Sequence, residues 1–291
     1  MGDARASVFI AMATRTQLTR THANENEATA RPPESIAAGG VPADYVQKNR
    51  AAWDRWALHY TATGRKAWTE KELRWGIWGV PESELELLTN VPQAADVIEL
   101  GCGTASVSSW LARGGLRPVA VDVSRPQLDV AARLQDEFGL SFPLIHANAE
   151  DVPYDTASFD LAISEYGASL WCEPHRWLAE TDRLLRPGGM LIFVTNSPLL
   201  MACTPEGGER AGDRLLRDYF TSPVREYPDG VIEFHLTHGS WIELLNAYGL
   251  SVERLVELRP PPGTQPRFDF VSIEWARRWP SEEIWVARKR R

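Results

Sequence analysis

Two acids and two glycines occur at a spacing that suits the binding of a nucleoside. Glu99 lies near the end of a short apolar run, Gly101 and Gly103 follow it, and Asp122 ends a second apolar run. Glycine permits positive φ and lets the backbone approach a ligand closely. A carboxylate roughly twenty residues beyond such a turn can hold the two hydroxyls of a ribose. These residues predict a nucleoside-like cofactor.

Strands and helices must alternate around these residues if they are to meet at one edge. Residues 96–100 are predicted to form a buried strand, which a tight turn connects to a helix from about Ala105. Ser124 and Pro126 can open the next helix, which places Gln127 in its first turn, within reach of the ribose. Further strands are expected at 142–147, 160–164 and 190–195.

The glycine turn leaves two classes of cofactor open. A dinucleotide fold prefers a third glycine three residues after the second, and this chain has Ser106 there. Glu99 is also an unfavourable neighbour for a pyrophosphate, whereas it suits a ligand with a positively charged end. An NAD(P)-dependent oxidoreductase is therefore disfavoured, but it remains an alternative.

At these residues the chain resembles the class I S-adenosylmethionine-dependent methyltransferases of small molecules (methyltransferase type 11-like). Their first motif, E-x-G-x-G, is matched by Glu99, Gly101 and Gly103. Residues 148–150 resemble the Asp-Ala-Glu triplet that addresses adenine, although Asn148 replaces the aspartate. The leucine-rich helix that ends in Arg-Pro-Gly-Gly at 186–189 adds a further match. The resemblance covers residues 96–195.

The resemblance implies S-adenosylmethionine as the cofactor, with S-adenosylhomocysteine as the product. Glu99 would orient the methionine end, the backbone at Gly101 and Gly103 would approach it, and Asp122 with Gln127 would hold the ribose. Asn148, Ala149 and Glu150 would border adenine. Ser164, at the end of the fourth strand, would also contact the cofactor, and Tyr60 and Trp75 would belong to a lid.

The resemblance also implies a fold and a division of the chain. The fold class is α/β, a three-layer Rossmann-like arrangement with a seven-stranded, mostly parallel sheet, an antiparallel last strand and an N-terminal helical cap. Residues 1–43 are polar and are expected to be a disordered arm. Residues 44–291 would form the methyltransferase domain, with a cap or lid at 44–90 and an acceptor-side insertion, expected to be helical, at 196–235.

Composition limits the partners. The formal net charge of -8 and the pI near 5.4 argue against nucleic acid and favour a small-molecule acceptor. No apolar run approaches the roughly 18 residues of a membrane helix, so no membrane partner is expected. The three cysteines have neither paired nor metal-ligand spacing, which predicts a cytoplasmic protein without a metal site. The oligomeric state stays open.

A sulfonium methyl group is already activated, so positioning of the acceptor can suffice for transfer. A general base is needed only for acceptors that must lose a proton, and no catalytic residue is assigned. The acceptor atom, whether O, N or C, also stays open. A non-catalytic S-adenosylmethionine-binding scaffold is a further alternative. The candidate bases at strand ends or in the covering segments are Glu165, Tyr166, His175, His235 and His238.

Overall fold

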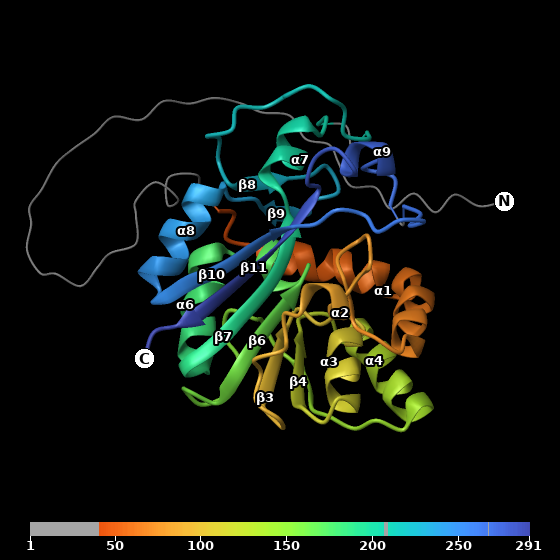
Figure 1. Ribbon diagram of the computed structural model, residues 1–291, viewed down its shortest axis with the longest axis vertical. Coiled ribbons are helices and arrows are strands. Elements are labelled where there is room, and N and C mark those ends of the chain that lie inside the picture. The colour runs from red at the N-terminus through yellow and green to blue at the C-terminus, as the bar shows by residue number, and fades with distance from the viewer. Residues whose placement is uncertain (1–40, 207–208, 267) are drawn as a thin grey trace, which may run out of the picture.

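A seven-stranded sheet forms the centre of the computed structural model, which describes residues 41–206, 209–266 and 268–291 (Figure 1). The strands follow the order β10-β11-β7-β6-β3-β4-β5. Strands β3 to β7 run parallel, and β11 runs antiparallel to both neighbours, so the predicted fold class is confirmed. The strands are β3 (Asp96–Leu100), β4 (Arg117–Asp122), β5 (Leu144–His146), β6 (Phe159–Glu165), β7 (Leu185–Asn196), β10 (Leu250–Glu257) and β11 (Glu282–Lys289).

Helices cover both faces of this sheet and produce three layers. Successive side chains of a strand point to opposite faces. Val97 therefore packs with α3 (Ser106–Arg113), whereas Ile98 packs with α6 (Pro174–Leu184) and α8 (His238–Ala247). Helix α4 (Arg125–Phe138) lies beside α3 (Figure 1). The central strands are buried on both sides, which explains their nearly continuous apolar sequences.

The segment after β7 differs from the helices expected for residues 196–235. It contains one short helix, α7 (Pro198–Cys203), and an antiparallel hairpin of β8 (Val224–Glu226) and β9 (Ile232–Phe234). Apolar and polar residues alternate along β9, and this period of two favours a strand. The remaining short helices are α5 (Ala168–Trp171) and α9 (Ile273–Ala276). Within the described ranges, no helix is long and apolar enough for a membrane crossing.

The N-terminal helix α1 (Tyr45–Thr69) lies across the carboxyl ends of the parallel strands (Figure 1). Ser124, beyond β4, donates its hydroxyl proton to Asp54 Oδ1 at 2.7 Å. Trp68 Nε1 donates to the carbonyl oxygen of Thr104, beyond β3, at 2.9 Å. The expected N-terminal helix is thus present. Most of the arm expected at 1–43 lies outside the described residues, and the division of the chain into these segments stays a prediction.

Gly64 brings α1 into direct contact with the glycine turn. A Cβ at this position would lie 2.9 Å from Thr104 Cβ and closer still to its hydroxyl. Real Cβ atoms essentially never come so near, so either the helix or Thr104 would have to move. The missing side chain at Gly64 therefore sets the distance between α1 and the turn.

Replacing Gly64 by alanine should destabilise the protein by about 1–3 kcal/mol, because the overpacking outweighs the helix propensity gained. Gly239→Ala is the matched control: Gly239 lies in the first turn of α8, where the nearest atom to an added Cβ is 3.9 Å away. Thermal unfolding of both variants checks this. A rise in Tm for Gly64→Ala as large as that for Gly239→Ala would contradict the close approach.

A buried carboxylate holds a small hairpin against the sheet. The hairpin consists of β1 (Arg74–Trp75) and β2 (Val80–Pro81), and the short helix α2 (Glu82–Leu85) follows it. Glu282 accepts hydrogen bonds from Ile77 N at 2.7 Å, Trp78 N at 3.3 Å and the Tyr166 hydroxyl at 2.7 Å. Burial raises the pKa of Glu282 from 4.5 to about 7 despite these donors.

This pKa predicts how Glu282 affects stability as pH changes. The folded state holds the Glu282 proton more tightly than the unfolded state, so wild type loses stability relative to Glu282→Gln as pH rises from about 4.5 to about 7. Thermal unfolding of both proteins across this range measures the effect. Glu243→Gln, on the exposed surface of α8, serves as the control. A Tm difference between wild type and Glu282→Gln that does not vary with pH would contradict the assignment.

Candidate functional site

The glycine turn joins β3 to α3 at the carboxyl edge of the sheet. Gly101 and Gly103 both have positive φ, at +78° and +53°. A Cβ on Gly101 would lie 2.6 Å from the Cα of Gly167, whereas one on Gly103 would meet only Gln127 Oε1, at 3.9 Å. Gly101 thus allows the ends of β3 and β6 to approach each other. Gly103 leaves space beside its backbone.

Asp122, at the end of β4, is hydrogen-bonded to this turn. Its Oδ2 accepts from Gly103 N at 2.7 Å, and its Oδ1 accepts from Ser124 N at 2.8 Å. Burial raises the pKa of Asp122 from 3.8 to about 6, although both backbone donors act in the opposite direction. The carboxylate therefore connects the two loops that follow β3 and β4.

Glu99, on β3, is almost completely buried, with 3% of its surface exposed. Its Oε2 accepts from the backbone N of Ser108 at 2.8 Å and from the Ser108 hydroxyl at 2.5 Å. Among the described residues, no donor reaches Oε1. Burial raises the pKa of Glu99 from 4.5 to about 8, and the charges of Glu165 and Asp122 add to this effect. Glu99 therefore carries a proton near neutral pH.

Gln127 adds an acceptor beside the turn. Only 1% of its surface is exposed, and its Oε1 is buried without a hydrogen-bond partner. An unpaired buried carbonyl oxygen is costly, so this site favours a ligand that brings a donor. Together, Glu99, Asp122 and Gln127 provide acceptor oxygens where a ribose or an ammonium group would supply the protons.

The expected adenine residues follow β5 and are bonded to one another. Asn148 Nδ2 donates to Glu150 Oε2 at 3.3 Å, and Glu150 N donates to Asn148 Oδ1 at 3.2 Å. Glu150 also accepts from the Tyr45 hydroxyl and from Glu173 N. These bonds engage both the amide and the carbonyl of Asn148, which was expected to border adenine, and they tie α1 to α6. Ala149 is buried beside them.

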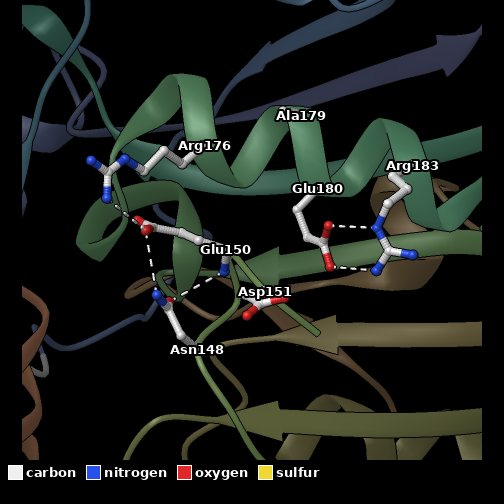
Figure 2. A pocket seen from close by; sticks show the side chains of 7 residues that line it. All are labelled: Asn148, Glu150, Asp151, Arg176, Ala179, Glu180 and Arg183. Atoms are coloured by element: carbon white, nitrogen blue, oxygen red, sulfur yellow. Dashed lines mark hydrogen bonds and ion pairs between the residues drawn. The ribbon is translucent and has the colours of Figure 1, made fainter. Parts of the chain in front are cut away.

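Asn148 and Glu150 also line a cleft of about 490 Å³ on the side of α6 (Figure 2). Glu180 and Arg183 form an ion pair at 2.6 Å in its wall. Arg176 lies 3.9 Å from Glu150, measured from Nη1 to Oε2. The charged groups of the cleft are thus largely paired with each other, so this cleft is not the best candidate for the cofactor.

Ser164 and Trp75 are satisfied by protein groups. The Ser164 hydroxyl lies 3.3 Å from that of Ser169 and accepts from Ser169 N at 3.0 Å, at the start of α5. Trp75 is 0% exposed, and its Nε1 donates to Glu82 Oε2 at 2.7 Å. The structure therefore places Trp75 in the core instead of in a lid, because burying the whole indole satisfies both its ring and its N–H.

Tyr60 belongs to a group of rings beside α5. Its ring centroid lies 5.4 Å from that of Trp53, which in turn lies 5.1 Å from Trp171 and 5.4 Å from Trp56. Trp171 Nε1 donates to the Tyr166 carbonyl at the end of β6. The structure thus brings Tyr60 to the carboxyl edge, near the strand that approaches the glycine turn. We name Trp53, Trp56, Tyr60 and Trp171 the aromatic cluster.

The five candidate bases have different surroundings. Glu165 Oε1 accepts from Gly76 N at 3.1 Å, and the Tyr166 hydroxyl is held by Glu282. His175 lies on α6, His235 follows β9, and His238 begins α8. His235 contacts the carboxylate of Glu233, and His238 contacts that of Glu283.

Sequence reasoning did not identify the residues by which α1 covers the turn. Asp54, Gly64 and Trp68 each contact the loops after β3 or β4. A glycine inside a tryptophan-rich helix is a signal of close packing. Its partner, Thr104, lies forty positions further along the chain, so the sequence alone does not reveal the contact.

Part of the chain matches a known protein family. Residues 98–193 match the methyltransferase domain family. The chain is similar to demethylmenaquinone methyltransferase of Clavibacter sepedonicus, with 36% identity over 98 residues, covering 33% of this chain and 39% of that protein. It is also similar to dimethylglycine N-methyltransferase of Parasynechococcus marenigrum (strain WH8102), with 32% identity over 144 residues, covering 44% and 51%. The chain thus spans about two fifths to one half of the length of these relatives.

A solved structure shares the fold over more of the chain. The 1,6-didemethyltoxoflavin-N1-methyltransferase of Burkholderia thailandensis, with bound 1,6-didemethyltoxoflavin and S-adenosylhomocysteine, superposes with a TM-score of 0.56 at 18% identity, covering 87% of this chain and 92% of that one. The segment matched by the family model contains both acids, both glycines and Gln127. Residues 98–193 thus carry a methyltransferase domain, and the chain as a whole has the fold of the S-adenosylmethionine-dependent methyltransferases that it resembles.

Proposed function

We propose that this protein transfers the methyl group of S-adenosylmethionine to a small-molecule acceptor. The observation that carries the proposal is the group of buried acceptor oxygens around Gly103. Asp122 and Gln127 lie next to the turn, and Glu99 lies on the strand that leads into it. This group occurs inside the segment that matches a methyltransferase domain.

The chemistry of these residues fits that cofactor. The two ribose hydroxyls can donate to Asp122 and to the unpaired Gln127 Oε1, and the ammonium of the methionine end can donate to Glu99 Oε1. A dinucleotide would bring a pyrophosphate instead. Its negative charges would be repelled by the Asp122 carboxylate and would find no positive charge at Glu99, and the turn lacks the third glycine. The acceptor set therefore favours S-adenosylmethionine over NAD.

The cofactor supplies a methyl group that is already activated for displacement by an acceptor lone pair. The chain has to bind, align and shield the reactants. Helix α1 covers the turn through Trp68 and Gly64, which would keep water from the site. Ala149, together with the backbone of Asn148 and Glu150 and with Ser164, would border adenine, and Tyr60 would contribute to the cover.

A small molecule is the acceptor class that the relatives favour. The names of the similar proteins indicate methylation of demethylmenaquinone, of dimethylglycine and of a toxoflavin precursor. The net charge of -8 also disfavours nucleic acid. Three free cysteines are compatible with a reducing compartment, so we infer a cytoplasmic location.

Calorimetric titration with S-adenosylmethionine, S-adenosylhomocysteine and NAD in parallel tests the cofactor. We expect the first two to bind and NAD not to bind. Asp122→Asn should weaken binding more than about tenfold, because the amide NH₂ that replaces one carboxylate oxygen cannot accept a hydrogen bond from a ribose hydroxyl. The exposed Asp129→Asn on α4 is the control. Binding of NAD alone would support the oxidoreductase, and cofactor binding without methyl transfer to any acceptor would support the scaffold.

The raised pKa of Glu99 predicts that cofactor binding releases a proton. Glu99 titrates at about 8 in the unliganded protein, and an ammonium group beside it stabilises the ionised form. Binding at pH 7 should therefore release roughly one proton, and affinity should rise as pH increases from about 6 to about 8.

Titration calorimetry in two buffers with different ionisation enthalpies measures this release. Glu99→Gln should remove the part of the proton release that comes from Glu99. This variant should also lose more affinity for the cofactor at pH 8 than at pH 6. The difference between wild type and variant isolates Glu99 from the amino group of the cofactor, which titrates in both. Equal proton release by the two proteins would show that Glu99 does not meet the ammonium.

A further inference from the structure

The β8–β9 hairpin carries a second buried polar group. Along β9, Ile232 and Phe234 pack on Tyr45 at the start of α1. Because side chains alternate along a strand, Glu233 and the following His235 lie on the opposite side. Their side chains are only 7% and 11% exposed.

The hydrogen bonds of this group determine which histidine nitrogen carries the proton. Glu233 Oε2 accepts from the Tyr227 hydroxyl at 2.7 Å and lies 2.8 Å from His235 Nε2. An ionised carboxylate only accepts hydrogen bonds, so Nε2 must carry the hydrogen. The opposite nitrogen, Nδ1, then presents a lone pair. This Nδ1 is buried and has no hydrogen-bond partner.

The hairpin lies next to the carboxyl end of β6. Asn49 of α1 donates to both the Trp171 and Ile232 carbonyls, at 3.1 and 2.8 Å, and accepts from Ile232 N at 2.8 Å. Trp171 ends α5, which begins directly after Gly167. Since Gly167 abuts Gly101 of the glycine turn, a short chain of contacts connects the hairpin with the cofactor turn.

The aromatic cluster borders the same space. Trp56 and Trp171 pack against Tyr227 and Val231 of the hairpin. Tyr227 also donates its hydroxyl proton to Glu233, which contacts His235. The hairpin thus connects the aromatic rings with an unpaired imidazole nitrogen, and this combination suits a planar acceptor that carries an acidic proton.

We propose that His235 is the general base for an acceptor with an aromatic or enolic hydroxyl, and that Glu233 is its positioning residue. This inference rests on the proposed methyl transfer. The acceptor ring would lie against the aromatic cluster, with its hydroxyl directed at Nδ1. Glu233 holds the Nε2–H tautomer and stabilises the imidazolium that forms.

The step balances without another reactant. His235 Nδ1 takes the proton of the acceptor hydroxyl, and the oxygen keeps the electron pair of the O–H bond. That oxygen then forms the bond to the methyl carbon as the carbon–sulfur bond breaks, and the pair of that bond stays on sulfur. The products are the methyl ether, S-adenosylhomocysteine and a protonated imidazole, which later releases its proton to solvent.

Several titratable or charged groups lie in the same region as the His235 imidazole. Glu233 lies on β9 and Tyr227 in the turn of the hairpin. Tyr60, on α1, has its pKa raised by burial and by the charge of Glu233. The Arg225 guanidinium of β8 lies 4.8 Å from the centre of the Tyr227 ring. Among the five candidate bases, only His235 combines a carboxylate partner with a buried ring nitrogen that has no hydrogen-bond partner in the described part of the chain.

Two phenols test the proposal with the full chain and S-adenosylmethionine. 4-Methylphenol holds its proton as tightly as tyrosine, with a pKa of about 10, whereas 4-nitrophenol is already ionised in mildly alkaline solution. His235→Asn should slow methylation of 4-methylphenol by about 10²-fold or more and should have little effect on 4-nitrophenol. Glu233→Gln should also slow 4-methylphenol more than 4-nitrophenol, because the amide no longer holds the tautomer that leaves Nδ1 free to accept a proton.

His238→Asn is the matched control. His238, at the start of α8, also has its Nε2 2.7 Å from a glutamate, Glu283. Its ring, however, packs on Trp285. This variant should keep wild-type rates, and thermal unfolding checks that all variants fold. If His235→Asn slows methylation of both phenols equally, or of neither, the assignment of His235 as the general base is overturned. Cofactor binding without turnover of either phenol by wild type would overturn the acceptor class, while absence of cofactor binding would overturn the proposed function.

Discussion

Burial of two carboxylates at adjacent strand ends is the constraint on which the rest of this edge depends. An isolated buried charge is unstable, so each acid must either find donors or keep its proton. Asp122 finds them in Gly103 N and Ser124 N, and its pKa rises only to about 6. Glu99 has only Ser108, and its pKa rises to about 8. The loops after β3 and β4 are therefore held in place by the same oxygens that a ligand would use, and a ligand with donors or positive charge would relieve the remaining cost.

Helix α1 converts this edge into an enclosed site. Its contacts with the loops after β3, β4 and β5 come from different turns of the helix, so the helix has one position along the edge that satisfies all of them. Gly64 reduces the distance to Thr104 to one that no other residue permits. Close packing of a helix over the turn strengthens electrostatic interactions beneath it, because it lowers the local dielectric. The same packing contributes to the raised pKa values of the acids.

Local sequence patterns were enough to predict the sheet and the two acids. The predictions that failed depended mostly on contacts that the local sequence does not reveal. Glu99 and Asp122 end apolar runs, and strand ends of a parallel sheet share one edge, so their meeting followed from the sequence. Trp75 was expected in a lid, but the residue that receives its N–H, Glu82, and the core around it could not be read from glycine spacing. The Asn148 carbonyl is taken by a neighbour only two residues away, and Tyr45, which binds Glu150, lies 105 positions earlier. The hairpin at 224–234 was mistaken for helix because its strands have three residues each, too few for a clear period.

The two ends of this edge differ in the way their polar residues are held. The cofactor side is built from loops that directly follow strands, and its acids depend on backbone donors within the same motif. The side of the β8–β9 hairpin is built from an insertion, and its polar residues depend on one another: Tyr227 and His235 share a single oxygen of Glu233. An insertion can change without disturbing the sheet, since the side-chain hydrogen bonds among Tyr227, Glu233 and His235 close within this segment. A change there alters which proton can be removed, while the glycine turn and its acids keep the same cofactor. The acceptor chemistry is therefore a property of the hairpin and the aromatic cluster, not of the sheet.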